Sequence, residues 1–263
     1  MNLTYKEFGK NRPHLVILHG LLGSSKNWHQ VARRLGQQLH VVVPDQRNHG
    51  DSPHGKHSLQ LLRDDVWELL QRLQLEKVVL MGHSMGGLAA MSFALAYPQL
   101  LSGLIVVDMA PQAQLGNIPE ILDALASVDL ADVKRREDAD RQLAERIGNA
   151  SIRQFLLQNL RRREDGSYAW RCNLPELQRF VRRETRLELN QRDQYAGPTL
   201  FVGGELSEQN LAGQQGLLVQ HFPNYQLVMI PDAGHWVHFD APLAFVETVL
   251  NFIKRIAGTT PPG

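Results

Sequence analysis

The feature that most constrains the fold is an alternation of short apolar runs with longer segments of helical periodicity. The apolar runs cover His14–Leu18, Leu39–Val43, Val78–Met81 and Leu104–Val107. Between the second and the third, the apolar residues of Leu59–Leu73 recur at steps of three and four, as they do on one face of a helix. Short strands that alternate with helices predict an α/β fold, with a mostly parallel central sheet flanked by helices.

The alternation continues on both sides of a long interruption. A helix is predicted at Ser84–Tyr97, strands at Thr199–Val202 and Gln226–Ile230, and a closing helix at Pro242–Ile256. Residues 112–190 contain no convincing strand run and are polar, helical in pattern and rich in arginine. We expect residues 1–111 and 191–263 to form one core and residues 112–190 to be a helical insertion. A separate domain is the alternative, although no long linker flanks the segment.

Composition excludes several classes of protein. The 263 residues suit one large domain, and 28 Lys and Arg against 27 Asp and Glu give no case for a nucleic-acid partner. The single Cys172 excludes an internal disulfide and falls short of a zinc site. Met1–Gly9 lacks the order of a secretory signal, and no apolar run approaches the roughly 18 residues of a membrane span. We expect a cytoplasmic enzyme or binding protein.

The motif Gly82-His83-Ser84-Met85-Gly86 lies directly between a predicted strand and a predicted helix. A sharp turn at this place lifts the serine hydroxyl clear of the sheet, and the glycines remove side chains that would clash. The partial positive charge of the helix N-terminus also favours the negative charge that develops in a reaction. This context predicts that Ser84 is a nucleophile. The alternative is a glycine-rich turn whose serine has no chemical role.

A nucleophilic serine needs a base, and eleven histidines are available. His235 follows the last predicted strand, which places it on the same carboxyl-terminal rim of the sheet as Ser84. His238 is its local rival, whereas His19 and His83 suit packing or backbone hydrogen bonds in strand-end turns. We predict that His235 is the base.

The predicted site also needs an acid and an oxyanion hole. Asp108 and Glu205 each follow a strand on the same rim, and spacing alone does not decide which of them orients the imidazole. One N–H donor for the oxyanion is expected at Met85, directly after the serine. The other is expected at Leu21, in the turn His19-Gly20-Leu21-Leu22-Gly23.

These motifs resemble those of the α/β-hydrolase superfamily from about Leu3 to Ile256. The strings Asp45-Gln46-Arg47-Asn48-His49-Gly50, Asp108-Met109-Ala110-Pro111 and Gly234-His235-Trp236 make the chain most similar to small capped YbfF-type carboxylesterases. The resemblance implies a serine carboxylesterase that forms an acyl-enzyme on a small ester, with Asp108 as the acid and Glu205 as its backup. It also implies a helical cap. We further expect a monomer or homodimer, and an esterase mechanism that needs neither a metal nor an organic cofactor.

The chain departs from these esterases after Gly203-Gly204. Such esterases often carry an Asn-Ser-Pro-Tyr-like loop that helps to bind substrate, whereas this chain continues Glu205-Leu206-Ser207-Glu208. The substrate contacts of that loop therefore cannot be transferred. We expect a structural role for the stretch from Asp45 to Ser52, in which Arg47 and His49 hold a strand-end loop by hydrogen bonds.

Two other functions compete with ester hydrolysis. One is a non-hydrolytic enzyme of the same fold, such as a C–C lyase or a cofactor-free haloperoxidase, and the other is a catalytically inactive binding module. The charge of the insertion gives a clue to the substrate. Residues 131–186 carry an excess of basic side chains, with 14 Lys and Arg against 9 Asp and Glu. Arg161-Arg162-Arg163 and Arg182-Arg183 suggest an anionic substrate such as an acyl-CoA thioester. A solvated helical face is the simpler interpretation.

Overall fold

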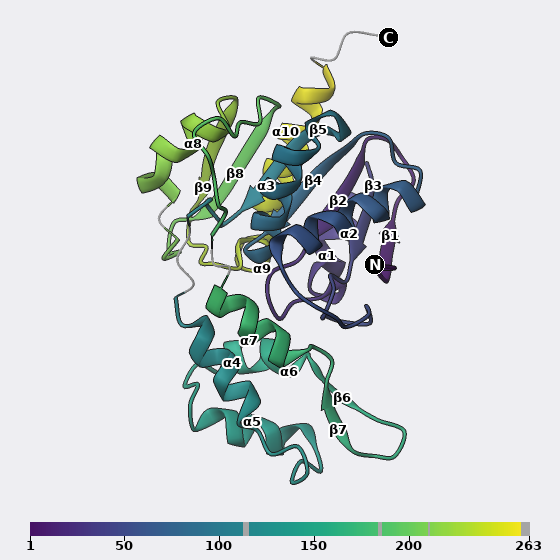
Figure 1. Ribbon diagram of the computed structural model, residues 1–263, viewed down its shortest axis with the longest axis vertical. Helices are drawn as coiled ribbons and strands as arrows, with labels where there is room; N and C mark the ends of the chain where they lie inside the picture. The colour runs from purple at the N-terminus through teal and green to yellow at the C-terminus, as the bar shows by residue number, and fades with distance from the viewer. Residues whose placement is uncertain (113–115, 184–185, 210, 259–263) are drawn as a thin grey trace.

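The computed structural model describes residues 1–112, 116–183, 186–209 and 211–258. Its centre is a seven-stranded sheet in the order β1-β3-β2-β4-β5-β8-β9 (Figure 1). The strands are β1 (Tyr5–Phe8), β2 (His14–Leu18), β3 (His40–Pro44), β4 (Val78–His83), β5 (Leu101–Val107), β8 (Thr199–Gly204) and β9 (Tyr225–Ile230). Only the β1–β3 pair is antiparallel in this sheet. The predicted α/β fold with a mostly parallel sheet is confirmed.

The helices follow in chain order, and those outside the β5–β8 connection flank the sheet. They are α1 (His29–Leu35), α2 (Leu59–Arg72), α3 (Met85–Ala96), α4 (Ile118–Ala126), α5 (Arg136–Ala144), α6 (Ala150–Leu157), α7 (Leu174–Arg183), α8 (Gln215–His221), α9 (Val237–Asp240) and α10 (Pro242–Gly258). Short 3-10 turns occupy Ser25–Trp28, Pro98–Leu100 and Leu211–Gln214. Within the described residues, no helix has both the length and the apolar character of a membrane span.

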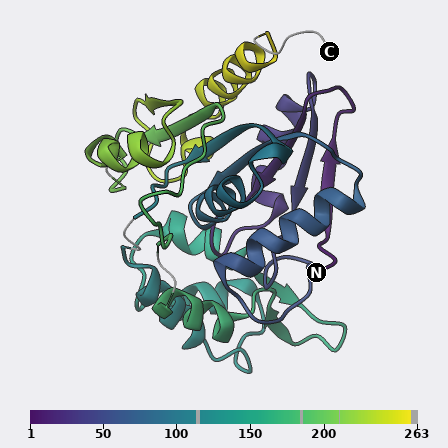
Figure 2. The ribbon, with the colours of Figure 1, turned by 45° about the horizontal axis from the view of Figure 1, so that its top comes forward.

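Two apolar layers hold the sheet between these helices. Along β2, Val16 and Leu18 belong to the layer that includes α2 and α3, while Leu15 and Ile17 belong to the layer that includes α1 and α10. Successive side chains of a strand point to opposite faces, so a strand covered on both faces is apolar at every position. This is why the sequence shows continuous apolar runs there. Figure 2 shows the helices lying along the two faces.

The intervening segment, defined here as residues 116–183 between β5 and β8, lies at one end of the sheet (Figures 1 and 2). It contains α4 to α7 and, contrary to the expectation that it holds no strand, a two-stranded hairpin of β6 (Leu160–Arg162) and β7 (Tyr168–Trp170). These strands escape sequence detection because each has three residues and β6 contains two exposed arginines. The domain boundaries at residues 112 and 190 stay predictions.

Candidate active site

The turn between β4 and α3 holds Ser84 in a strained conformation. Its φ of 53° and ψ of −121° are rare for a residue with a side chain, and such strain is concentrated at functional positions. Both flanking glycines are sterically required. A Cβ on Gly82 would lie 2.0 Å from the carbonyl oxygen of Gly86, and a Cβ on Gly86 would lie 2.4 Å from that of Leu18. The backbone therefore turns tightly and leaves Ser84 partly exposed.

Asp108 directly follows β5 and is fully buried. Its carboxylate oxygen Oδ2 lies 2.7 Å from Nδ1 of His235, and its Oδ1 accepts a hydrogen bond of 3.2 Å from the amide of Gly204. The structure therefore brings Asp108 and His235 together across 127 residues of chain. Glu205, the other candidate acid, is exposed and makes no hydrogen bond with His235 in the described part of the chain.

Ser207 is a member of this cluster that the sequence did not reveal. Its hydroxyl donates a 2.5 Å hydrogen bond to Asp108 Oδ2, the same oxygen that accepts the bond from His235. Ser207 stands three residues after β8, in the loop where the chain departs from similar esterases. A lone loop serine carries no motif, so only the fold shows its contact. The carboxylate is thus held by three donors, which fix its orientation.

The remaining histidines of this region are buried and kept neutral by their surroundings. His83 Nε2 donates to the carbonyl of His235, and burial together with the nearby His235 and His238 keeps the pKa of His83 well below its usual value. His238 stacks on Trp28 with ring centroids 4.0 Å apart, and burial followed by the charge of His235 lowers its pKa to about 3. A base with such a low pKa is poorly matched to neutral pH, so the rival His238 has the weaker case.

The turn after β2 lies against Ser84. A Cβ on Gly20 would lie 3.2 Å from the Cβ of Ser84, so this turn and the serine are in immediate contact. The amides of Leu21 and Met85 donate to no acceptor within the described residues. Both amides therefore remain free to donate to a bound group. Within the described residues, no hydrogen bond joins Ser84 Oγ to His235. Hydrogen bonds between a nucleophile and its base are often long before substrate binds.

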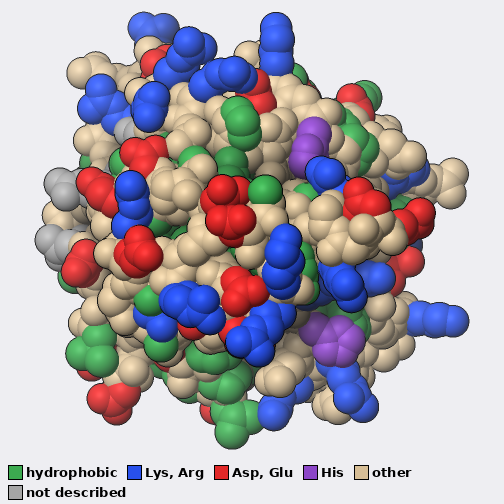
Figure 3. All heavy atoms as spheres, turned by 90° about the horizontal axis from the view of Figure 1, so that it is seen from below, with side chains coloured by type: hydrophobic (Ala, Val, Ile, Leu, Met, Phe, Trp, Pro, Cys, Tyr) green, Lys and Arg blue, Asp and Glu red, His purple; other side chains and the backbone are tan. Residues whose placement is uncertain are grey.

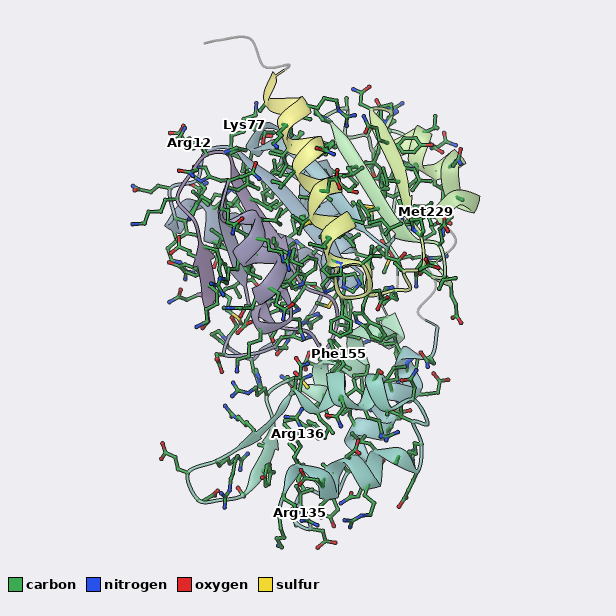
Figure 4. All side chains as sticks on the ribbon, turned by 180° about the vertical axis from the view of Figure 1, so that it is seen from behind. Arg12, Lys77, Arg135, Arg136, Phe155 and Met229 are labelled. Carbon is green, nitrogen blue, oxygen red and sulfur yellow. The ribbon has the colours of Figure 1, made fainter. Side chains whose placement is uncertain are left out.

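One cavity of about 450 Å³ joins these groups. Its lining includes Ser84, His235 and the turn around Leu21 from the core, and residues of α4 and α6 from the intervening segment. The contributions of those helices are apolar: Ile118, Ile121, Ile152, Phe155 and Leu156. Phe155 also packs against Trp236, with ring centroids 5.4 Å apart, and Figure 4 labels it at the junction of the sheet and the intervening segment. A cavity of this size and lining suits a small ligand with an apolar part.

Charged side chains lie mainly outside this cavity. Among its described lining residues, Glu208 is the only one with a charged side chain other than histidine. Arg161, Arg162 and Arg163 are exposed on the β6–β7 hairpin, and Arg182 faces Asp123 at 3.8 Å. Figure 3, seen from the side of the intervening segment, shows basic and acidic side chains interspersed. Within the described residues, no three His, Cys, Asp or Glu side chains are grouped to hold a metal ion.

Comparison with known proteins gives consistent matches over nearly the whole chain. A family model described as alpha/beta hydrolase fold matches residues 13–242. The sn-1-specific diacylglycerol lipase ABHD11 of Danio rerio is 38% identical, over 97% of this chain and 83% of that protein. Esterase YbfF of Escherichia coli is 29% identical, over 93% of this chain and 94% of that protein. The solved structure of a marine microorganism esterase superposes with a TM-score of 0.91 at 36% identity, covering 95% of this chain and 98% of that one.

Proposed function

Since this chain belongs to the alpha/beta hydrolase fold family and is a hydrolase, we propose that it is a serine carboxylesterase with Ser84 as its nucleophile. The observation that carries the proposal is the 2.7 Å contact between Asp108 and His235, since His235 lines the same cavity as Ser84. A carboxylate in this position fixes the tautomer of the imidazole and stabilises its protonated form. The other imidazole nitrogen is then available to take the proton of a serine hydroxyl.

The proposed reaction proceeds in two halves. His235 removes the proton of Ser84 as the serine oxygen attacks the ester carbonyl, and the amides of Leu21 and Met85 donate to the resulting oxyanion. His235 then gives the proton to the leaving alcohol, which leaves an acyl group on Ser84. In the second half, His235 takes a proton from water, the hydroxide attacks the acyl carbonyl, and the proton returns to Ser84 as the acid departs.

The cavity lining favours a neutral ester with an apolar chain. Ile121, Ile152 and Phe155 offer apolar surface where one part of a substrate would lie, and the intervening segment acts as a cap over the serine. The name of the relative from Danio rerio, a diacylglycerol lipase, describes a substrate of this kind. An acyl-CoA thioester has less support, since the arginine clusters lie outside the described lining.

A fluorophosphonate probe tests the nucleophile. The wild-type protein should be labelled at one site and should hydrolyse p-nitrophenyl esters, whereas Ser84→Ala should lose both properties. Labelling of Ser84→Ala at the same site would overturn the proposal. A panel of neutral esters and acyl-CoA thioesters then ranks the substrate classes. Labelling without hydrolysis of any ester would instead favour a non-hydrolytic enzyme such as a C–C lyase.

A further inference from the structure

Leu22, in the turn after β2, is held by hydrogen bonds to both its amide and its carbonyl. Its φ is +60°, a conformation that a residue with a side chain adopts only under constraint, and it is buried. Its amide donates a 3.1 Å hydrogen bond to Nε2 of His49. Its carbonyl accepts a 2.7 Å hydrogen bond from the side-chain amide of Asn159. The first partner belongs to the loop after β3, and the second belongs to the intervening segment, 137 residues away.

Together with neighbouring bonds, these two bonds fix three successive peptide planes, from Gly20 to Gly23. The carbonyl of Gly20, which shares a plane with the Leu21 amide, accepts bonds from the Gly23 amide at 3.0 Å and from His19 Nδ1 at 2.8 Å. The plane between Leu21 and Leu22 is fixed by His49. The plane between Leu22 and Gly23 is fixed by Asn159 on its carbonyl side and by Gly20 on its amide side. A trans peptide directs its N–H opposite to its C=O, so the bonds to Gly20 determine where the Leu21 amide points.

The partners are themselves held in place. His49 is fully buried, and its Nδ1–H donates to the carbonyl of Arg47 at 2.9 Å, so Nε2 carries the lone pair that faces Leu22. Asn159 is 4% exposed and stands between α6 and β6, directly before the first residue of β6. Its backbone carbonyl accepts a 2.7 Å bond from the amide of Arg171, next to the β6–β7 hairpin. Neither side chain lines the cavity within the described residues, so we expect neither to contact a bound substrate.

We propose that Asn159 and His49 are positioning residues of the oxyanion hole, and that the intervening segment therefore takes part in the chemistry as well as covering the site. The inference rests on the proposed function. If the Leu22–Gly23 plane rotates, the bond of Asn159 and the bond between Gly23 and Gly20 break together. The Gly20–Leu21 plane then loses a restraint, and the Leu21 donor leaves its direction. Because an oxyanion exists only after attack, this loss affects the transition state rather than substrate binding.

The test compares two neighbouring residues of the intervening segment. Asn159→Ala removes the bond to Leu22, and Asn159→Asp replaces the donor by a carboxylate of the same shape. Gln158→Ala is the matched control, because Gln158 accepts a 2.7 Å bond from Asn27 and so also ties the segment to the core, but without touching Leu22. We expect kcat to fall by about tenfold to a hundredfold in both Asn159 variants with KM unchanged, and by less than about twofold in the control.

A second measurement separates positioning from folding. An alkyl boronic acid forms a tetrahedral adduct with the serine, so its inhibition constant should rise in the Asn159 variants in proportion to the loss of kcat. Fluorophosphonate labelling and thermal stability show whether the nucleophile and the fold are intact. If the wild type is active and the Asn159 variants match Gln158→Ala in kcat and in boronate affinity, this inference is wrong and the proposed function stands. If the wild type neither reacts with the probe nor hydrolyses an ester, both fail.

Discussion

Asp108 is the residue at which the hydrogen bonds of the site converge. It is buried, and its two oxygens accept bonds from His235, Ser207 and the amide of Gly204. A buried carboxylate is stable only when its lone pairs are satisfied in this way. This arrangement is what the proposed role of Asp108, the orientation of His235, requires, whereas Glu205 is exposed at the surface.

The first prediction compares these two carboxylates. Asp108→Asn keeps the size of the side chain but removes the charge and changes the preferred tautomer of His235, so kcat should fall by about 10³–10⁴-fold. Glu205→Gln removes a charge of the same sign from the neighbouring strand end and should change kcat by less than about twofold. Steady-state kinetics on one p-nitrophenyl ester measures both. A large loss in Glu205→Gln with a small one in Asp108→Asn would reassign the acid.

The second prediction concerns Ser207. Its hydroxyl donates to Asp108 Oδ2, the oxygen that also contacts His235, so it restrains the carboxylate that orients the imidazole. Ser207→Ala should therefore lower kcat by up to about tenfold on a p-nitrophenyl ester, because the carboxylate loses one restraint. Ser207→Thr retains the hydroxyl and should restore kcat. An alanine variant with the kcat of the wild type would show that Ser207 only fills space.

At the scale of elements, the turn between β4 and α3 is the most constrained connection in the fold. Strand β4 lies between β2 and β5, and α3 packs on both of its neighbours in the sheet, so the turn cannot widen to accept side chains. The two glycines of the serine motif meet backbone atoms of β2 and of the helix itself. The packing of the fold alone therefore requires glycine at both positions of the motif.

The third prediction uses two glycines with opposite surroundings. Gly86→Ala places a Cβ 2.4 Å from the carbonyl of Leu18, which cannot move within the sheet, so the free energy of unfolding should fall by about 2–4 kcal/mol. Gly216→Ala, in α8, meets nothing within 4 Å and should leave stability unchanged or raise it by up to about 1 kcal/mol. Urea denaturation compares the two. Equal midpoints would mean that the turn after β4 relaxes more freely than its contacts indicate.

Prediction of elements from the sequence succeeds where burial makes them apolar on both faces. The runs at β2, β3, β4 and β5 are visible for this reason. Strand β1 escapes prediction, because this antiparallel edge strand has only partly exposed and exposed positions. The hairpin of β6 and β7 escapes prediction because two strands of three residues carry no measurable periodicity.

For the site, the sequence likewise indicates some residues and leaves others undetected. Ser84, His235, Asp108 and Leu21 stand in motifs or at strand ends, where parallel topology alone brings them to one rim. The contacts of Ser207 and Asn159 depend on how a loop and a distant segment dock, and no local pattern encodes that. The roles given to all of these residues stay predictions until the variants are measured.

At the scale of the whole molecule, an unusual share of the histidines is buried. His19, His49, His57, His83 and His238 all have lowered pKa values, in each case first because of burial. For His57 and His238 the pKa falls to about 3. The folded protein therefore holds these rings neutral at pH values where the unfolded chain would protonate them.

The fourth prediction is a loss of stability in acid. As pH falls below the unfolded pKa of about 6.5, the unfolded chain binds protons that the folded chain does not, so the free energy of unfolding decreases. At pH 5.5 the loss should be about 1.4 kcal/mol for each of His57 and His238. Urea denaturation from pH 7.5 to 5.5 measures the slope. His57→Gln should reduce this slope by the equivalent of about one bound proton. A flat profile in the wild type would contradict the prediction.

Several hydrogen bonds and an ion pair join the intervening segment to loops that come much earlier in the sequence. Asn159, Arg171 and Asn173 reach back to Leu22, Asp51 and Asn48, all of which lie in the first fifth of the sequence. Synthesis on a ribosome runs from the N-terminus, so the receiving loops leave the exit tunnel more than one hundred residues before the segment that binds them. The strands after the segment arrive last and bring His235 with them. His235 is thus the last of the candidate site residues to be synthesised, after the loops and the segment that these bonds join.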